Sequence, residues 1–420
     1  MKKLFLFVFS SLYFVNAMHA APVVKDEVLL AQGKDSYQSV RHIVIKGTNE
    51  EIGKVLGDIA RKDYDIAKLP QYPDAVYAKA EKIYMQNNYP ALSDRSKGVA
   101  ASYGEKYEDS LSVFNQLVYD AGPWSGCSSV YYPPSYTVDN SGFLGHNMDY
   151  PLCSINKLLK RPEDGSPSMF TRNYVLELYP DNGYASIGVG TGDLLSVISG
   201  MNDKGLIVVL HTDNYTLINT DPKADISGLV YPTQILRCIL DTCETVDEAK
   251  MVVLNNKLSL TFEPGHLLIA DTSGKSICVE INPKNARVEI TENDGTPQPF
   301  TNHPIYRFKD PAGFPEYKPF EEDNTFARYN KLIDLLGKKK QFSVDDVIDN
   351  EMQVVARWNN PGRGMANPTI PNRTIWTDLY DQKERTLKVK FYLKDGPMDP
   401  ETGDPKELVY SELFTFKLQK

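Results

Sequence analysis

The chain has 420 residues and an ordinary globular composition, with 41% hydrophobic and 24% charged residues. Its formal net charge of −9 argues against nonspecific nucleic-acid binding, which needs a basic surface. The length allows either two or three domains or one large α/β domain.

The N-terminus is typical of a secretory signal peptide. Residues 1–20, MKKLFLFVFSSLYFVNAMHA, contain two lysines, then an apolar stretch, then small residues. The apolar core is shorter than the roughly 20 residues that a membrane span needs, and no later stretch is long enough. We therefore expect an exported protein without a stable membrane span, periplasmic or secreted in a bacterium and lysosomal in a eukaryotic host.

Residues 21–126 are predicted to be mostly helical after an initial strand at 40–47. Amphipathic patterns predict helices over 49–65, with Asn49 as N-cap, and then over 75–90 and 110–123. The apolar faces at 52–59 and 112–119 need a partner surface to bury them.

The chain becomes rich in strands from residue 127. The segments CSSVYY and FLGHNMDY (143–150) are predicted strands on either side of a turn-prone loop. A hairpin is predicted across 202–205, and a meander of three strands over 266–290. Two further strands are predicted at the end of the chain. Helices are predicted at 231–243, 245–256 and 326–338, and 291–323 reads as a surface loop. This order of elements indicates an α+β fold with sheets and helix layers.

Five cysteines occur, at 127, 153, 238, 243 and 278. Because the number is odd, one thiol stays outside intrachain pairs or pairs between chains. We favour the interpretation that the four cysteines other than Cys127 are small buried apolar residues. No Cys-x-x-Cys pair exists and no histidine cluster has zinc-ligand spacing, so the sequence predicts neither a metal nor a cofactor.

Gly126 and Cys127 form a candidate self-cleavage site. A thiol needs a base to become a nucleophilic thiolate, and a chain's own α-amino group has a pKa suited to that purpose. Cys127 gains such a group only if the chain is cut after Gly126, where a missing Cβ leaves the scissile carbonyl uncrowded. The alternative is that CSSVYY is a plain core strand with a buried cysteine.

The returning strand of the same predicted hairpin ends near Asp149. This pairing brings its carboxylate close to Cys127, where it could accept hydrogen bonds from an ammonium group or hold the amide of a substrate.

Several segments together resemble the linear amide C–N hydrolases, a family of N-terminal-nucleophile (Ntn) enzymes. The family includes choloylglycine hydrolase, penicillin V acylase, penicillin acyltransferase, N-acylethanolamine acid amidase and acid ceramidase. The similar segments follow the family's order: CSSVYY, GHNMD (145–149), GMNDKGL (200–206), FTNHP (300–304), TFARYNKL (325–332) and TIWTDLYDQKERTLKV (374–389).

The resemblance implies a four-layer αββα sandwich of antiparallel sheets and a role for each matching residue. Cys127 would be the nucleophile and, through its free amine, the general base, and Asp149 would hold that amine. Asn302 would donate its side-chain amide to the oxyanion, and Arg328 would balance charge around the thiolate. Without the resemblance, Asn302 reads as a turn residue and Arg328 as a solvated helix residue.

Two positions depart from the family pattern. The second oxyanion residue, an asparagine in choloylglycine hydrolases, falls by counting on Thr212, next to His211. His146 stands where many members have arginine. Because histidine is mostly uncharged at pH 7, either the thiolate receives less help or the site works best at mildly acidic pH. The other interpretation of His146 is a strand histidine bonded to a loop.

The resemblance divides the chain into a signal peptide (1–20), a helical pro-segment (21–126) and a catalytic part (127–420). The pro-segment would remain bound as an α-subunit, and a higher oligomer is left open. The expected partner is a small N-acyl amide substrate, and no nucleic acid. Three functions fit: hydrolysis of a linear amide, acyl transfer on the same scaffold, or binding by a catalytically inactive member.

Overall fold

The computed structural model describes most of the chain after the N-terminus. The described residues are 22–120, 126–213, 230–256, 258, 265–293, 295–315, 324–359 and 370–419. The predicted signal peptide and Ser125 lie outside them. Within the described residues, no helix is both long and apolar enough to cross a membrane.

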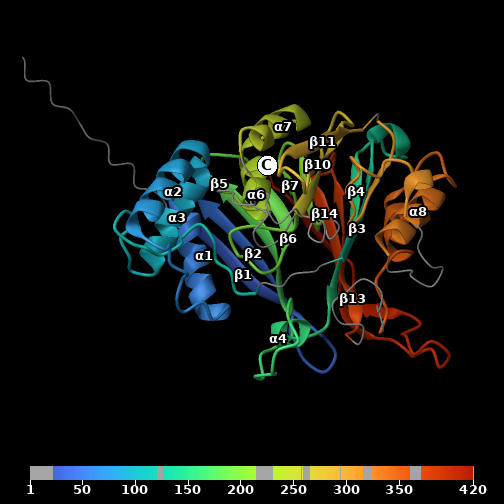
Figure 1. Cartoon of the computed structure of the whole chain (residues 1–420), viewed down its shortest axis with the longest axis horizontal. Coiled ribbons are helices and arrows are strands. Elements are labelled where there is room, and N and C mark those ends of the chain that lie inside the picture. Colours follow the sequence, from blue (N-terminus) through green and yellow to red (C-terminus); the bar gives the residue numbers. More distant parts are fainter. Residues whose placement is uncertain are drawn as a thin grey trace, which may run out of the picture.

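A nine-stranded sheet forms one half of the molecule (Figure 1). Its strands lie in the order β1-β2-β5-β6-β7-β8-β9-β10-β11. Their bounds are Val23–Leu30 (β1), Ser39–Gly47 (β2), Arg172–Pro180 (β5), Ser186–Gly190 (β6), Ser199–Asn202 (β7), Ile207–Thr212 (β8), Gly265–Ala270 (β9), Ser276–Ile281 (β10) and Val288–Glu292 (β11). The sheet contains the predicted hairpin (β7–β8) and the predicted meander (β9–β11), and both are confirmed.

The second sheet has seven strands and carries the candidate nucleophile. Its order is β12-β3-β4-β13-β14-β15, and β16 also pairs with β14. The bounds are Gln298–Phe300 (β12), Gly126–Tyr132 (β3), Phe143–Pro151 (β4), Asn372–Asp381 (β13), Thr386–Asp395 (β14), Leu408–Tyr410 (β15) and Phe414–Lys417 (β16). All its described ladders are antiparallel.

Helices cover the outer face of each sheet, and the two inner faces pack on each other. Figure 1 shows the N-terminal helices on the side away from α8, with the sheets between them. The helix bounds are Asn49–Asp63 (α1), Ala75–Asn88 (α2), Pro90–Ser102 (α3), Ile155–Leu158 (α4), Pro232–Thr242 (α6), Val246–Leu254 (α7), Thr325–Leu336 (α8) and Val344–Met352 (α9).

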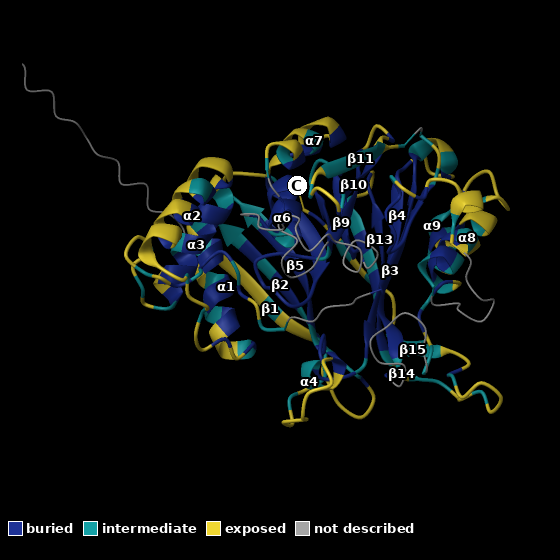
Figure 2. Ribbon diagram, viewed as in Figure 1, coloured by how far each residue is buried: buried dark blue, intermediate teal, exposed yellow. Residues whose placement is uncertain are grey.

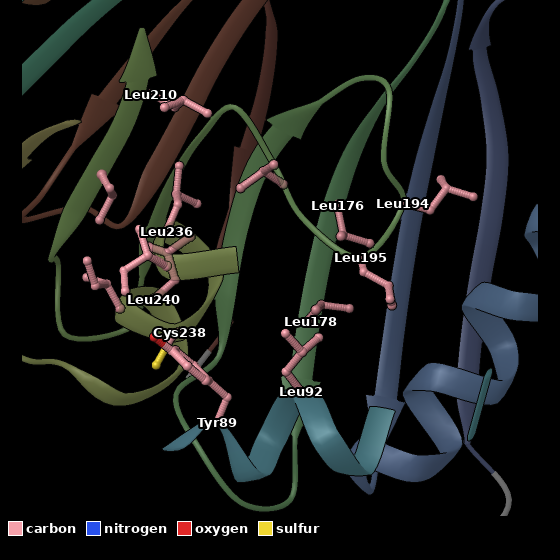
Figure 3. Packing of buried hydrophobic residues seen from close by; sticks show 14 of the residues in the cluster. Tyr89, Leu92, Leu176, Leu178, Leu194, Leu195, Leu210, Leu236, Cys238 and Leu240 are labelled. Carbon is pink, nitrogen blue, oxygen red and sulfur yellow. The ribbon is translucent and has the colours of Figure 1, made fainter. Parts of the chain in front are cut away.

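Three buried apolar clusters correspond to these contacts. The first joins α1, α2, α3, α6 and α7 to the nine-stranded sheet; Figure 3 shows part of it, with Leu92 of α3 near Leu178 of β5 and Tyr89 beside Cys238 of α6. The second lies between the sheets and includes Cys127. The third joins β3, β4 and β13 to α8 and α9. Because both faces of β3 and β4 are covered, every residue of the two strands is buried (Figure 2).

Residues 22–120, the described part of the predicted pro-segment, are less helical than predicted, because they supply two strands to the large sheet. The strand β1 was not predicted, and β2 pairs with β5 in parallel. This pair departs from the expected purely antiparallel sheets. Parallel neighbours need a long crossover connection, and here the whole of α1 to β4 lies between them in the sequence.

The predicted helix over 110–123 is wrong for its described part, 110–120. Phe114 and Leu117 are buried, but their segment has no helical turn, and neighbouring residues hold it instead of helical hydrogen bonds. The Leu117 amide donates to Asp193 Oδ1 (2.8 Å) and the Tyr119 amide to the Gly192 carbonyl (2.9 Å). The helix α3 was missed instead, since Pro90 was taken as a helix end although proline is favoured at the first helical position.

A buried ion cluster joins the pro-segment to the rest of the chain. Arg95 of α3 donates two hydrogen bonds to Asp241 of α6 (2.6 and 3.0 Å), and Arg237 lies 2.8 Å from the same carboxylate. All three side chains are at most 2% exposed. One carboxylate therefore serves two buried guanidinium groups.

We expect Asp241→Asn to lower the free energy of unfolding by about 3 kcal/mol or more, because it leaves two buried cations without their counter-ion. Urea unfolding measures this loss. The matched control is Asp58→Asn, which removes the exposed ion pairs with Lys54 and Arg61 and should change stability by less than about 1 kcal/mol. Equal effects of the two substitutions would contradict this account of the cluster.

Candidate active site

The hairpin β3–β4 places the candidate cleavage site beside Asp149. Gly126 lies opposite Asp149 in the ladder, and Cys127 lies opposite Met148. A Cβ built on Gly126 would lie 3.1 Å from Asp149 Cβ and 3.2 Å from its Oδ2. Gly126 therefore allows a close approach between the candidate scissile residue and the carboxylate. The hairpin prediction had placed Asp149 close to Cys127, and the ladder places it opposite the preceding residue.

Cys127 is held by its backbone as well as by its side chain. Its N–H donates to Asn302 Oδ1 (2.9 Å), its carbonyl accepts a hydrogen bond from Arg328 Nη1, and its thiol donates to Met148 Sδ (3.6 Å). The residue is 1% exposed. The nitrogen that a cut would convert into an α-amine thus already donates a hydrogen bond to a polar side chain.

Asn302 lies in the segment 291–323 that was predicted to be a surface loop, and that prediction is wrong for residues 298–305, which are buried. The preceding strand β12 pairs with β3, and Asn302 is 2% exposed. Its Oδ1 accepts from both Cys127 and Arg328 Nη2 (2.7 Å), and its Nδ2 donates to the Thr212 carbonyl (2.8 Å). The amide group predicted to serve an oxyanion is therefore engaged by Thr212 in the uncut chain.

Arg328 projects from α8 and links three candidate residues. Besides its bonds to Cys127 and Asn302, its Nη1 lies 3.7 Å from Asp149 Oδ2. Its side chain is 6% exposed, so the alternative of a solvated helix residue is wrong. A buried guanidinium at this position compensates a buried carboxylate and polarises the Cys127 carbonyl.

Asp149 is a buried carboxyl with two compensating partners. Burial raises its pKa, while the Arg328 charge and the hydrogen bond from Thr374 Oγ1 (2.5 Å) oppose that rise. Thr374 lies in β13 within a segment that resembles the family, but nothing in the sequence pattern singled it out.

His146 and His211 approach Cys127 from β4 and β8. A ligand atom from each of the three side chains lies within 4.8 Å of the others, and all three residues are buried. These three residues, called the Cys127 set below, bring one thiol and two imidazoles together. Sequence spacing could not reveal the whole set, because His211 lies on β8, far along the chain from the β3–β4 hairpin that carries the other two residues.

The two histidines have different hydrogen-bond partners. His211 Nε2 bonds Ser129 Oγ (2.7 Å) and its Nδ1 bonds the Thr301 carbonyl (3.2 Å). Burial, with the nearby histidines, lowers its pKa well below the usual value, so His211 is neutral. His146 Nδ1 bonds Asp378 (3.2 Å), a strand residue rather than the loop considered in the alternative interpretation.

Two further carboxyl groups near the site were not predicted. Asp378 of β13 accepts hydrogen bonds from Ser199 Oγ (2.6 Å) and Trp376 Nε1 (3.0 Å) as well as from His146. Glu351 of α9 is fully buried near Ser128, and burial together with the Asp378 and Asp149 charges raises its pKa well above the usual value. This environment favours the protonated form of Glu351.

The remaining cysteines lack the setting of a nucleophile. All five cysteines lie in the described part of the chain, all are buried, and no disulfide joins them. Burial raises the pKa of the Cys153 and Cys243 thiols to about 11 and that of Cys238 to about 12. The interpretation of the four as small buried residues is confirmed.

Residues 138–394 match the family model of acyl-coenzyme A:6-aminopenicillanic acid acyl-transferase. The match spans more than half of the chain, and the chain belongs to this family of Ntn amide hydrolases and acyltransferases. The matched region includes Asp149, Asn302 and Arg328 and begins after Cys127. A search of curated proteins gives no match.

Solved structures with a similar fold come from three kinds of enzyme. A variant of conjugated bile acid hydrolase from Clostridium perfringens has 17% identity and a TM-score of 0.44, covering 70% of this chain and 98% of its own. Penicillin V acylase from Agrobacterium tumefaciens has 17% identity and a TM-score of 0.42, with coverages of 65% and 84%. The Caenorhabditis elegans N-acylethanolamine-hydrolyzing acid amidase ortholog has 13% identity and a TM-score of 0.34, with coverages of 61% and 93%.

Proposed function

We propose that the chain is an exported, self-processing amidohydrolase that cleaves linear N-acyl amides through an acyl-enzyme on Cys127. The observation that carries the proposal is the setting of the Cys127 nitrogen. Its N–H donates a hydrogen bond to Asn302 Oδ1, and Arg328 donates to the same oxygen. Asp149 lies opposite the preceding glycine in the ladder. An α-amine released at this point would enter a polar site with a compensating carboxylate.

In the proposed reaction, the α-amine of Cys127 takes the proton of its own thiol. A free α-amine has a pKa near 7.7 to 8.0 and so exchanges protons readily at neutral pH. The thiolate then attacks the substrate carbonyl, the amine product leaves, and water hydrolyses the thioester. Asp149 would hold the ammonium form, while Arg328 balances the buried negative charge.

The oxyanion would be stabilised by the Asn302 side-chain amide. This group donates to the Thr212 carbonyl in the uncut chain, so the role requires that bond to be exchanged for the substrate oxygen. Thr212 and His211, which adjoin it at the end of β8, are the candidates for a second donor.

The pro-segment would remain bound after the cut as an α-subunit. Its strand β2 is inserted between β1 and β5 of the large sheet, and Arg95 pairs with the buried Asp241. Removing the segment would expose a sheet face and take away one of the two buried guanidinium partners of Asp241. The layers of helix, sheet, sheet and helix would then be the four-layer sandwich of Ntn hydrolases, built from two chains.

The export part of the proposal rests on the pattern of residues 1–20 alone. Periplasmic or secreted in a bacterium, or lysosomal in a eukaryote, are the locations that this pattern favours.

Acyl transfer is a second candidate, because the matching family model is named for an acyl-transferase. The acyl-enzyme would be the same, and a second amine instead of water would accept the acyl group.

A panel of N-acyl amides tests both candidates. The members of the panel differ in their acyl or amine parts, which include fatty, steroidal, aryl and β-lactam groups. Mass spectrometry detects the released acid and amine. We expect wild-type protein to cleave at least one member and Cys127→Ala to cleave none. An added acceptor amine that yields a new amide at the expense of acid would identify a transferase. A correctly cut protein that cleaves no member would favour a binding protein instead.

A further inference from the structure

Three adjacent strands of the seven-stranded sheet align a thiol, an imidazole and a carboxylate on one face. Cys127 of β3 lies opposite Met148, and His146 lies two residues before Met148 on β4. Side chains two residues apart in a strand point to the same face and are diagonal neighbours across the ladder. Asp378 of β13 lies directly opposite His146. The order across the sheet is therefore Cys127, His146, Asp378.

Asp378 fixes the orientation of the imidazole. Its carboxylate accepts a hydrogen bond from His146 Nδ1 (3.2 Å). The same carboxylate accepts hydrogen bonds from Ser199 and Trp376, which hold it in place. A carboxylate on one ring nitrogen places the proton there and leaves a lone pair on the other nitrogen. His146 Nε2 is fully buried and has no hydrogen-bond partner within the described part of the chain.

His211 does not offer the same lone pair, although it belongs to the same set of three residues. Both of its ring nitrogens are engaged, one by Ser129 and one by the Thr301 carbonyl. The set contains two imidazoles. Within the described part of the chain, His146 is the one whose second ring nitrogen has no hydrogen-bond partner and can take up a proton.

The uncut chain needs such a base. Before the cut, the Cys127 nitrogen is an amide that donates its only hydrogen to Asn302, so it cannot accept the thiol proton. We propose that His146, oriented by Asp378, is the base that activates Cys127 for self-cleavage. The α-amine would take over this task only after the cut. The inference rests on the proposed self-processing function and adds a second proton acceptor to it.

The proposed self-cleavage has two stages, an acyl shift from nitrogen to sulfur and a hydrolysis. His146 Nε2 takes the Cys127 thiol proton, and the sulfur attacks the Gly126 carbonyl carbon. When the bond from that carbon to the Cys127 nitrogen breaks, the imidazolium returns its proton to the leaving nitrogen. The products are a thioester on Cys127 and a free α-amine. Water then hydrolyses the thioester to a Gly126 carboxylate and restores the thiol.

The test follows self-cleavage of the full chain made by cell-free translation, with the appearance of two fragments measured over time. We expect His146→Gln to slow cleavage by about a hundredfold or more, the usual contribution of a general base. His146→Arg should be equally slow, since arginine supplies a cation but no base. Cleavage of His146→Gln at the wild-type rate, or its restoration by arginine, would overturn the inference.

His266→Gln is the matched control. His266 is also fully buried, its Nδ1 also faces a buried carboxylate (Glu280, 3.3 Å), and its Nε2 also lacks a hydrogen-bond partner among the described residues. It lies outside the Cys127 set, so we expect this variant to be cut at the wild-type rate. Equal slowing in both variants would mean that loss of a buried histidine–carboxylate pair, rather than of a base, is responsible.

Chemical rescue separates a chemical role from a structural one. In His146→Ala, added imidazole should restore cleavage, whereas pyrazole, which has the same shape but is a far weaker base, should not. Equal effects of the two compounds would overturn the inference. If wild-type protein itself is never cut, the proposed function fails; if wild type is cut and His146→Gln is cut equally fast, only the present inference fails.

Discussion

Replacing Cys127 by alanine is expected to leave the chain in one piece and to abolish amide hydrolysis. Both reactions need the same sulfur, first against the Gly126 carbonyl and then against the substrate carbonyl. Denaturing electrophoresis should show one band where wild type shows two, and product analysis should find no released acid.

Cys278→Ala is the control for this experiment. Cys278 is a fully buried thiol of β10, and burial raises its pKa well above the usual value. Its loss removes a similar volume from the same intersheet cluster but no nucleophile, so we expect normal cutting and normal hydrolysis. A Cys127→Ala chain that is still cut before residue 127 would show that another group performs the cleavage.

The second large effect is expected from Arg328→Met. This substitution leaves Asp149 buried without its counter-ion, which typically lowers the free energy of unfolding by about 3 to 5 kcal/mol. It also removes the hydrogen bonds to the Cys127 carbonyl and to Asn302. We expect self-cleavage to slow by about a hundredfold, as when one charge-stabilising donor is removed. Urea unfolding and the cleavage time course measure the two effects.

A double variant separates the stability loss from the loss of chemistry. Arg328→Met combined with Asp149→Asn no longer buries an unpaired charge, so most of the stability should return while cleavage stays slow. Arg61→Met, at an exposed arginine of α1, should leave both quantities unchanged. Rapid cleavage in the stable double variant would contradict the assignment of Arg328 to the site.

The local parts of the fold could be predicted because short-range chemistry determines them. The hairpin across Asn202 to Gly205 formed as expected. The helix predicted from residue 245 also formed, with Thr245 as its N-cap in a capping box with Glu248. The position of Asp149 beside the start of β3 followed from the pairing of two neighbouring strands. In each case the partners lie within one hairpin or one helical turn.

The long-range parts could not be predicted, because one sequence does not show which strands become neighbours. Nothing near His146 indicates Asp378, which reaches it only when β13 pairs with β4. Periodicity also misled where tertiary contacts replaced helical ones, as at Phe114 and Leu117. The polar composition around Asn302 suggested exposure, whereas pairing of β12 with β3 buries the segment.

The most direct test of the whole account is the N-terminal sequence and intact mass of the large fragment of purified wild-type protein. The account predicts a fragment that begins Cys-Ser-Ser-Val at Cys127, with a smaller fragment ending at Gly126 that copurifies with it. An intact chain, or a large fragment beginning at any other residue, would contradict the claim that Cys127 becomes an N-terminal nucleophile.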